Sequence, residues 1–161
     1  IDDLPVGDEG EIVDPVSIIP LKIEFDLPVF PAFQRNSNDP FLLKVQESGK
    51  KWVILTSLEG VPKLVINSDL FLRDALFGVE PFRPYSYCHR PIVVSDVKTP
   101  LGDVIQKLRV HPEHSEDDVI DNDLILCWDK EKRIITGADL LGRLLRGIAG
   151  RRPQFVLPEE K

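Results

Sequence analysis

Residues 53–76 read VILTSLEGVPKLVINSDLFLRDAL, and a related pattern returns at residues 123–146 as DLILCWDKEKRIITGADLLGRLLR. Without any gap, Leu124 aligns with Ile54 and Asp139 aligns with Asp69, an offset of 70 positions (124 − 54). An internal repeat constrains the architecture before any single motif does. We therefore expect two copies of one small unit, related by a pseudo-twofold axis, with a cleft between them in which a ligand can lie.

The first copy predicts the order helix, strand, turn, strand, helix. Asp39-Pro40 is typical of a helix start, with an aspartate N-cap and a proline at the first helical position, and Gly49 can end that helix. We expect strands over 52–56 and 63–66, a turn at Glu59-Gly60 and a helix over 68–77. An additional strand over 21–25 is expected in the extended segment that precedes this copy.

The second copy predicts a strand over 92–94, a helix that begins after Thr99-Pro100 and runs to Leu108, strands over 124–128 and 133–135, and a helix over 136–148. Ten extra residues separate its first helix from its first hairpin strand, and the polar, acidic stretch 111–120 predicts a surface loop there. The last helix carries a strong apolar stripe at Leu140, Leu141, Leu144, Leu145 and Ile148.

Composition limits the functional class. The 161 residues are 42% hydrophobic and 29% charged, which is typical of a globular protein, and the net charge of −7 argues against a nucleic-acid partner. No apolar run approaches the ~18 residues of a membrane span. The two cysteines lack C-x-x-C spacing and predict buried reduced thiols in a cytoplasmic protein. Because the chain starts at Ile1 and has no methionine, we expect a piece of a longer protein, such as the cytosolic part of a membrane protein.

The junction between the last strand and the last helix is the strongest candidate site. Thr136 ends the strand and Asp139 follows three residues later, at a helix N-terminus whose unpaired N–H groups attract anions. Thr136 can hold a phosphate, and the Asp139 carboxylate can accept hydrogen bonds from both hydroxyls of a ribose. The same Thr-x-x-Asp pattern is also a helix-capping pattern that needs no ligand, so both interpretations stay open.

This set of features resembles a tandem CBS domain, the motif pair of cystathionine β-synthase. The resemblance covers residues 33–149 and rests on the repeated helix–strand–strand–helix order, the Thr136–Asp139 spacing, Thr99-Pro100 before a helix and Asp129 in the hairpin. It implies an α+β fold of tandem CBS-like βαββα repeats packed as one pseudo-twofold unit. With Ile92-Val93-Val94 it most resembles CBS pairs attached to bacterial ion-transport proteins.

The resemblance also implies a function. A CBS pair of this kind is a regulatory module, not an enzyme, which binds AMP, ADP, ATP or S-adenosylmethionine between its motifs without a metal, forms a homodimer and controls an attached or partner enzyme or transporter. The nucleotide-binding candidates are then Thr136, Asp139, Thr99, Val94, Arg133 and Asp69. In the first copy, Ile66 stands at the position that Thr136 occupies in the second. Because Ile66 has no hydroxyl to hold a phosphate, we expect at most one good nucleotide site.

The domain boundaries follow from this division. Residues 1–32 form an acidic, proline-rich extension whose first 14 residues are expected to be solvated, 33–78 form the first motif, 79–91 a linker, 92–149 the second motif and 150–161 a tail. A ligand-free CBS-like dimerisation scaffold is the main alternative function. A metal-dependent hydrolase that uses His111, His114 and the acidic residues beside them, or a Cys88–His89 nucleophile pair, ranks far lower.

Overall fold

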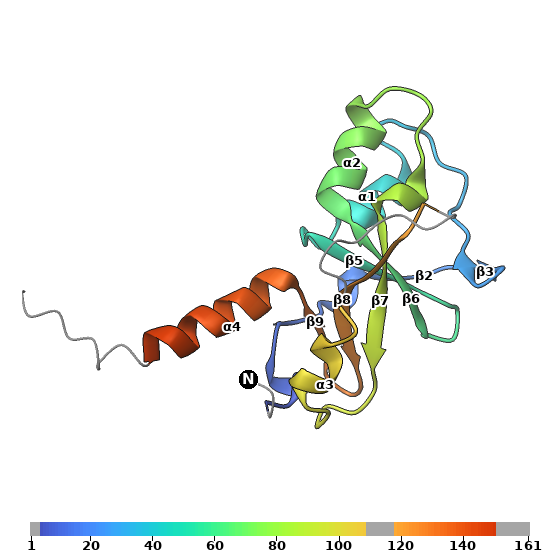
Figure 1. Ribbon diagram of the computed structural model, residues 1–161. Coiled ribbons are helices and arrows are strands. Elements are labelled where there is room, and N and C mark those ends of the chain that lie inside the picture. Colours follow the sequence, from blue (N-terminus) through green and yellow to red (C-terminus); the bar gives the residue numbers. More distant parts are fainter. Residues whose placement is uncertain (1–3, 109–117, 151–161) are drawn as a thin grey trace, which may run out of the picture.

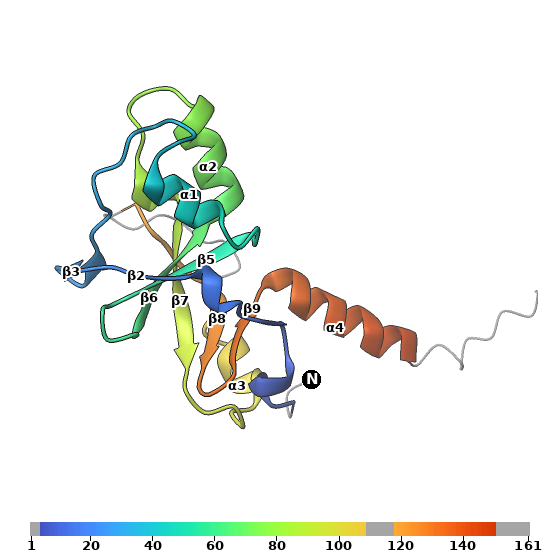
Figure 2. The same cartoon turned by 180° about the vertical axis from the view of Figure 1, so that it is seen from behind.

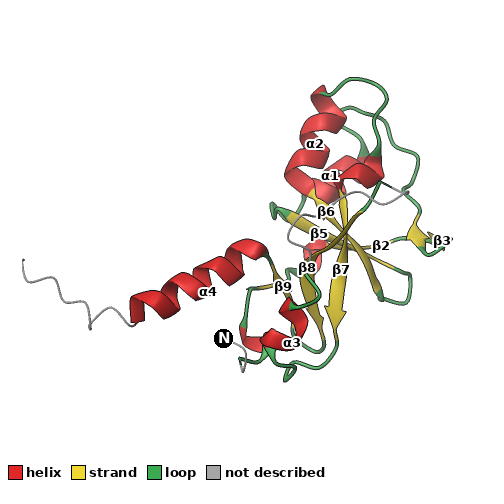
Figure 3. Ribbon diagram, in the orientation of Figure 1, coloured by secondary structure: helices red, strands yellow, loops and turns green. Residues whose placement is uncertain are grey.

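The computed structural model describes residues 4–108 and 118–150, and it belongs to the expected α+β class (Figure 1). The chain forms one seven-stranded sheet and a separate two-stranded hairpin of β3 (Ile23–Glu24) and β4 (Leu27–Pro28). Three helices, 40–46, 68–77 and 101–105, lie beside the large sheet, and the last helix, 137–150, projects away from it (Figure 3). Across the described residues, no helix is both long enough and apolar enough to cross a bilayer.

The first half of the sheet contains β2 (Ile18–Pro20), α1 (Pro40–Gln46), β5 (Trp52–Thr56), β6 (Pro62–Asn67) and α2 (Ser68–Phe77). Strand β2 runs parallel to β5, and β5 pairs with β6 in an antiparallel hairpin. This confirms the predicted order of helix, two strands and helix.

The second half repeats that arrangement with β7 (Cys88–Val94), α3 (Leu101–Ile105), β8 (Ile120–Trp128), β9 (Lys132–Ile135) and α4 (Gly137–Gly150). Strand β7 is parallel to β8, and β8 pairs with β9 in an antiparallel hairpin. The halves are joined edge to edge where β6 pairs with β7, and β1 (Glu11–Ile12) adds to the far edge beside β9. The strand order is β1-β9-β8-β7-β6-β5-β2.

Three apolar clusters form the core on the two faces of this sheet. Alternate side chains of β5 and β6 face α1 and α2, and alternate side chains of β8 and β9 face α3. The opposite faces of the two halves pack against each other through a cluster, here called the central cluster, that contains no helical residue. Its buried members are Val13, Ile54, Val65, Leu124, Leu126 and Ile134.

The hairpin turns of the two halves are also joined directly. Trp128, at the end of β8, donates a hydrogen bond from Nε1 to the carbonyl oxygen of Gly60 in the β5–β6 turn, over 3.1 Å. The Lys132 ammonium lies 5.1 Å from the centre of the Trp128 ring, on its face. Trp128 therefore links the tips of the two hairpins.

Local sequence signals explain the ends of the first-half helices. Asp39 caps α1 by accepting hydrogen bonds from the N–H groups of Phe41 and Leu42, and a bond from the Gln34 N–H is the main cause that lowers the pKa of the Asp39 carboxyl. At the C-terminus of α2, the Arg35 guanidinium donates hydrogen bonds to the carbonyl oxygens of Asp74, Ala75 and Gly78. These bonds supply partners to carbonyl groups at the end of the helix.

Several sequence expectations need correction. The first 14 residues are not simply a solvated leader, because Val6, Glu9 and Val13 are buried and β1 joins the sheet. The strand expected over 21–25 is replaced by β2 and the small β3–β4 hairpin.

In the second half, β7 starts at Cys88, inside the expected linker, and β8 starts at Ile120, inside the expected loop. The start of β8 was not predicted because its polar side chains are typical of a loop. In the folded chain they are paired: Asp121 forms an ion pair with Arg90, and Asp123 contacts His89. Of the surface loop expected over 111–120, residues 111–117 lie outside the described part of the chain, and Val119 is buried in the first-half cluster.

Gly10 explains how the N-terminal segment approaches the sheet so closely. Its φ is +71°, and a Cβ at this position would lie 2.1 Å from the Ile134 carbonyl oxygen. Gly49 has a similar φ of +67°, but a Cβ there would meet no atom within 4 Å. The two glycines therefore share a backbone conformation and differ in available space.

We predict that Gly49→Ala lowers the free energy of unfolding by about 1 kcal/mol, the cost of a left-handed conformation for an L-residue. Gly10→Ala adds a backbone clash and should cost at least about 2 kcal/mol more. Urea unfolding followed by circular dichroism measures both values. Equal losses in the two variants would show that the contact of Gly10 with β9 is not needed for stability.

Candidate functional site

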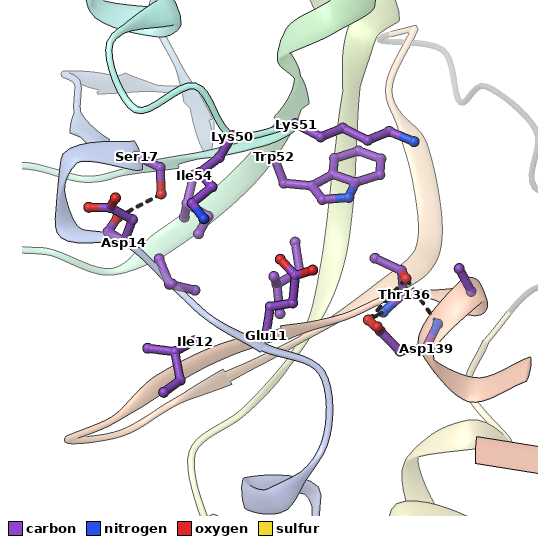
Figure 4. Close-up of a pocket in the computed structure, with 13 residues that line it drawn as sticks. Glu11, Ile12, Asp14, Ser17, Lys50, Lys51, Trp52, Ile54, Thr136 and Asp139 are labelled. Atoms are coloured by element: carbon purple, nitrogen blue, oxygen red, sulfur yellow. Dashed lines mark hydrogen bonds between the residues drawn. The ribbon is translucent and has the colours of Figure 1, made fainter. Parts of the chain in front are cut away.

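A cavity of about 250 Å³ lies between the two halves, at the ends of the hairpins that are remote from the Trp128 contact (Figure 4). Three segments form its walls: the start of β5, the β9–α4 junction and the N-terminal segment around β1. The lining residues are Glu11, Ile12, Val13, Asp14, Ser17, Lys50, Lys51, Trp52, Ile54, Ile134, Thr136, Ala138 and Asp139.

The wall from the second half is the helix start that the sequence singled out. Asp139 Oδ2 accepts hydrogen bonds from the Thr136 N–H over 2.9 Å and from the Thr136 hydroxyl over 3.0 Å. In return, the Asp139 N–H lies 3.3 Å from Thr136 Oγ1 and donates to it. The two residues thus form a reciprocal cap at the N-terminus of α4 while both are partly exposed to the cavity.

The wall from the first half carries two cations. Lys50 and Lys51 precede β5, and their main chain is held by Ser68 at the start of α2. The Ser68 hydroxyl donates to the carbonyl oxygens of Lys50 over 2.5 Å and Lys51 over 2.9 Å, and the Ser68 N–H donates to the Lys51 carbonyl oxygen over 2.7 Å. The serine of the first repeat therefore positions the basic wall of the cavity.

Trp52 places an aromatic ring on the same wall. The Lys51 ammonium lies 5.0 Å from the ring centre, and the His89 ring meets the indole edge to face with 5.2 Å between centroids. His89 is buried, and its Nδ1 lies 2.8 Å and 3.0 Å from the two carboxylate oxygens of Asp123. This support behind the indole favours a fixed ring orientation.

The N-terminal segment closes the cavity with acidic side chains. The carboxylate of Glu11 projects between the two walls in Figure 4. Asp14 is already engaged, because its Oδ1 accepts from the Val16 N–H over 2.9 Å as the cap of the 3₁₀ helix Pro15–Ser17. Arg133 anchors the segment through its Nη1, which lies 3.4 Å from the carbonyl oxygen of Glu9 and 3.3 Å from that of Gly10.

The cavity can therefore hold a small ligand with an aromatic ring and hydroxyl groups. Trp52 with Ile54 and Ile134 offers apolar surface for a ring, and Asp139 offers a hydrogen-bond acceptor. The formal lining charge is −1: two lysines contribute +2, and Glu11, Asp14 and Asp139 contribute −3. That charge disfavours a ligand with many negative charges.

Of the predicted nucleotide-binding residues, Thr136 and Asp139 lie together on this cavity, and the other four are not among its described lining residues. Val94 packs on the cluster under α3, and the carbonyl oxygen of Thr99 accepts from the Val6 N–H over 3.0 Å. Asp69 is exposed on the first turn of α2, whose N-cap is Asn67. Arg133 supports the cavity indirectly, through the N-terminal segment.

Of the lower-ranked chemical candidates, the Cys88–His89 pair lacks the geometry of a nucleophile and its base. Cys88 and His89 are neighbours on a strand, so Cys88 points into the cluster under α2 while His89 contacts Asp123. Burial raises the pKa of the Cys88 thiol, which opposes thiolate formation, and both cysteines are free and buried as expected. His111 and His114 lie outside the described residues, and within those no group of three or more potential metal ligands occurs.

The sequence did not reveal two parts of the cavity lining: the wall formed by the start of β5 and the side formed by the N-terminal segment. Lys50, Lys51 and Trp52 stand at the start of a strand that was predicted correctly. Their role follows only once the start of one repeat is placed opposite the helix start of the other. The pair Ile12-Val13 inside the acidic segment was the available signal for β1.

No protein-family model, no curated protein and no solved structure matches this chain. What the cavity can bind therefore follows from its own geometry and chemistry.

We predict that Asp139→Ala lowers the free energy of unfolding by about 1 kcal/mol, because the reciprocal cap of α4 is lost. Asp69→Ala is the matched control: it occupies the equivalent repeat position, but it does not cap α2. Urea unfolding of both variants without any ligand measures the difference. Equal stability of the two variants would contradict a capping role for Asp139.

Proposed function

We propose that the chain is a tandem CBS-like regulatory module that binds an adenosine-containing ligand in the cavity between its halves. The observation that carries this proposal is the meeting of both halves at one cavity, with Trp52 and two lysines on one wall and Thr136 with Asp139 on the other. On this proposal, ligand binding favours one arrangement of the halves and thereby controls an attached or partner protein.

The order and pairing of the strands support the CBS-like assignment. Each half contains a strand, a helix, a parallel strand, an antiparallel strand and a helix, and the halves pack through the central cluster. An empty helix cap would explain Thr136 and Asp139 but not the aromatic and basic wall that faces them.

The Asp139 carboxylate can cap α4 and bind a ligand at once. Both hydrogen bonds from Thr136 go to Oδ2, so a ribose hydroxyl can approach Oδ1 without breaking the cap. The adenine ring would then lie against Trp52, and a phosphate or a carboxylate would face Lys50 or Lys51. Aromatic stacking, a carboxylate acceptor and a nearby cation are the groups that an adenosine ligand needs.

The charge of the cavity favours adenosine ligands with few negative charges. With a lining charge of −1 and the Glu11 carboxylate between the walls, a triphosphate meets more repulsion than a monophosphate does. S-adenosylmethionine carries a sulfonium and an ammonium cation, which the acidic closure would attract. Among the ligands of this class, AMP and S-adenosylmethionine therefore fit best.

The ligand-free scaffold remains the second candidate because one specific observation favours it. Thr136 and Asp139 already satisfy each other, so the helix start is stable with an empty cavity. A scaffold of this kind would use the two halves only to present surfaces to partners.

We predict that isothermal titration calorimetry detects binding of AMP and S-adenosylmethionine, with weaker binding of ATP. Asp139→Ala should weaken binding at least tenfold, because one ribose hydrogen bond to a charged group contributes about 1.5–3 kcal/mol. Asp69→Ala should bind like the natural sequence. Absence of heat and of any melting shift at millimolar concentration of every ligand would leave the scaffold as the function.

We also predict that Glu11→Gln raises the affinity for ATP several-fold more than the affinity for AMP, because it removes one negative charge beside the phosphates. Glu47→Gln removes the same charge at the end of α1, from a residue that does not line the cavity, and serves as the control. Calorimetry at low ionic strength maximises the effect. An unchanged ratio of ATP to AMP affinity would place the phosphates away from Glu11.

A further inference from the structure

The two halves carry residues of opposite charge at equivalent positions, and only one of the two pairs is in contact. In the second half, Arg90 of β7 and Asp121 of β8 are neighbours across the parallel ladder, and Arg90 Nη1 donates to Asp121 Oδ1. At the repeat offset of 70 (121 − 51), Asp121 corresponds to Lys51, which lines the cavity. The first-half counterpart of Arg90 follows from the strand pairing.

Glu11 is that counterpart. Strand β7 pairs antiparallel with β6, in a register that, continued by one residue, sets Arg90 opposite Leu64. Strand β1 pairs antiparallel with β9, and there Glu11 faces Ile134. Ile134 corresponds to Leu64 at the same offset of 70 (134 − 64). Glu11 therefore stands at the position of Arg90, across the cavity from Lys51, and the charges of the pair are reversed.

The equivalence continues beyond this pair. Ile92, two positions after Arg90, faces Ile125 of β8. Ile19 of β2 faces Leu55 of β5. Because these two partners are also 70 positions apart (125 − 55), Ile19 corresponds to Ile92. The N-terminal segment from β1 to β2 is thus the first-half counterpart of the single strand β7.

An insertion in this segment keeps the first-half pair apart. Strand β7 needs two positions (92 − 90), whereas the N-terminal segment uses eight, from Glu11 to Ile19 (19 − 11). The extra residues include the 3₁₀ helix Pro15–Ser17, and Figure 2 shows this longer connection, in blue, between β9 and β2. Strand β1 is therefore a neighbour of β9 but not of β5, and the cavity occupies the space between.

Glu11 and Lys51 are available to each other across the cavity. The Glu11 carboxylate projects between the walls (Figure 4), and within residues 4–108 and 118–150 neither residue forms an ion pair. The Lys51 ammonium lies 5.0 Å from the centre of the Trp52 ring, while Ser68 holds the Lys51 main chain. Because a lysine has a flexible four-carbon stem, its ammonium can leave the ring without any movement of the backbone.

The backbone around Glu11 is anchored on both sides. Arg133 contacts the carbonyl oxygen of Gly10, and a Cβ on Gly10 would already lie 2.1 Å from β9. On the other side, the Val13 N–H donates to the Lys132 carbonyl oxygen over 2.8 Å, and the Val13 side chain is buried in the central cluster. Contact between Glu11 and Lys51 therefore involves rotation of two side chains and no displacement of a strand.

We propose that Glu11 and Lys51 form a gate that closes the cavity when no anion occupies it. The closed gate is an ion pair of the same kind as Arg90 with Asp121, with the charges exchanged between the strands. The Glu11 carboxylate then takes the position of a ligand anion at Lys51, so an anionic ligand must displace it. The gate itself is defined by this chain alone, whereas its opposition to AMP rests on the proposed function.

The gate makes the charge of the ligand part of its recognition. A ligand that competes with Glu11 for Lys51 binds with an affinity reduced by the fraction of closed cavities. The phosphate of AMP gains the Lys51 contact in exchange for opening the gate. Adenosine has no anionic group and gains nothing there, so the gate favours AMP over adenosine.

A double-mutant cycle without any ligand tests the gate. Glu11→Gln and Lys51→Gln should be coupled by about two- to fivefold in the unfolding equilibrium constant, measured by urea unfolding at low ionic strength. The control is the cycle of Glu11→Gln with Lys50→Gln, because Lys50 also lines the cavity but corresponds to the uncharged Ile120 (120 − 50). Additive effects in the Lys51 cycle, or equal coupling in both cycles, overturn the inference.

Charge exchange tests the same pair with the opposite polarity. Glu11→Arg together with Lys51→Asp copies the Arg90–Asp121 pair into the first half. The doubly exchanged chain should unfold at a higher urea concentration than either single variant, because each single change places like charges on both sides of the cavity. A doubly exchanged chain that is no more stable than both single variants contradicts the pairing.

Calorimetry with AMP tests the competition separately. Glu11→Gln should raise the affinity for AMP several-fold, with a smaller gain for adenosine, and the gain for AMP should be several-fold smaller when Lys51→Gln is also present. An equal gain with and without Lys51 would show that Glu11 merely repels the phosphate, which overturns the gate. Absence of AMP binding to every chain would remove the proposed function, whereas the ligand-free cycle would still decide the gate.

Discussion

The face-to-face packing of the two half-sheets through the central cluster is the contact on which the other features of the protein depend. Ile54 and Val65 come from the first half, and Leu124, Leu126 and Ile134 come from the second. Because these residues alternate with those that face the helices, each strand contributes to two cores at once. The start of β5 is thereby brought opposite the start of α4, which creates the cavity. A one-residue slip in any of these strands would exchange the two cores and remove the cavity.

The N-terminal segment contributes to two of the apolar clusters and to the cavity lining. Val6 fills the core under α3, Val13 belongs to the central cluster, and Glu11 closes the cavity. Glu9 provides the buried partner of Arg143, and hydrogen bonding to that carboxylate raises the pKa of the Arg143 guanidinium. A segment of this composition could be mistaken for a solvated tail, yet it joins the cavity, the sheet edge and the last helix. This segment packs on the second half, through Val6 and the pairing of β1 with β9, so the two repeats have different environments.

The sequence predicted the elements whose signals are local and missed those that depend on distant partners. Strand β5 and helix α2 were predicted with their correct bounds, because an apolar run and a helical period are readable within about ten residues. The start of β8 was missed because Asp121 and Asp123 look like loop residues until Arg90 and His89 are placed beside them. Thr136 and Asp139 were found from their spacing, whereas Lys50 and Trp52 acquire a role only from the packing of one repeat on the other. The outward direction of α4 depends on Glu9, which is 134 positions away (143 − 9) and carries no local signal.

The bond from Trp128 to Gly60 fastens the two hairpins at one end, while the cavity separates them at the other. The halves are joined at that other end as well, because Val65 and Ile66 of β6 pair with His89 and Cys88 of β7. Helix α4 continues outward from the cavity end of the second hairpin. Any rotation of one half against the other would be enlarged at the far end of α4, because that helix extends away from the sheet.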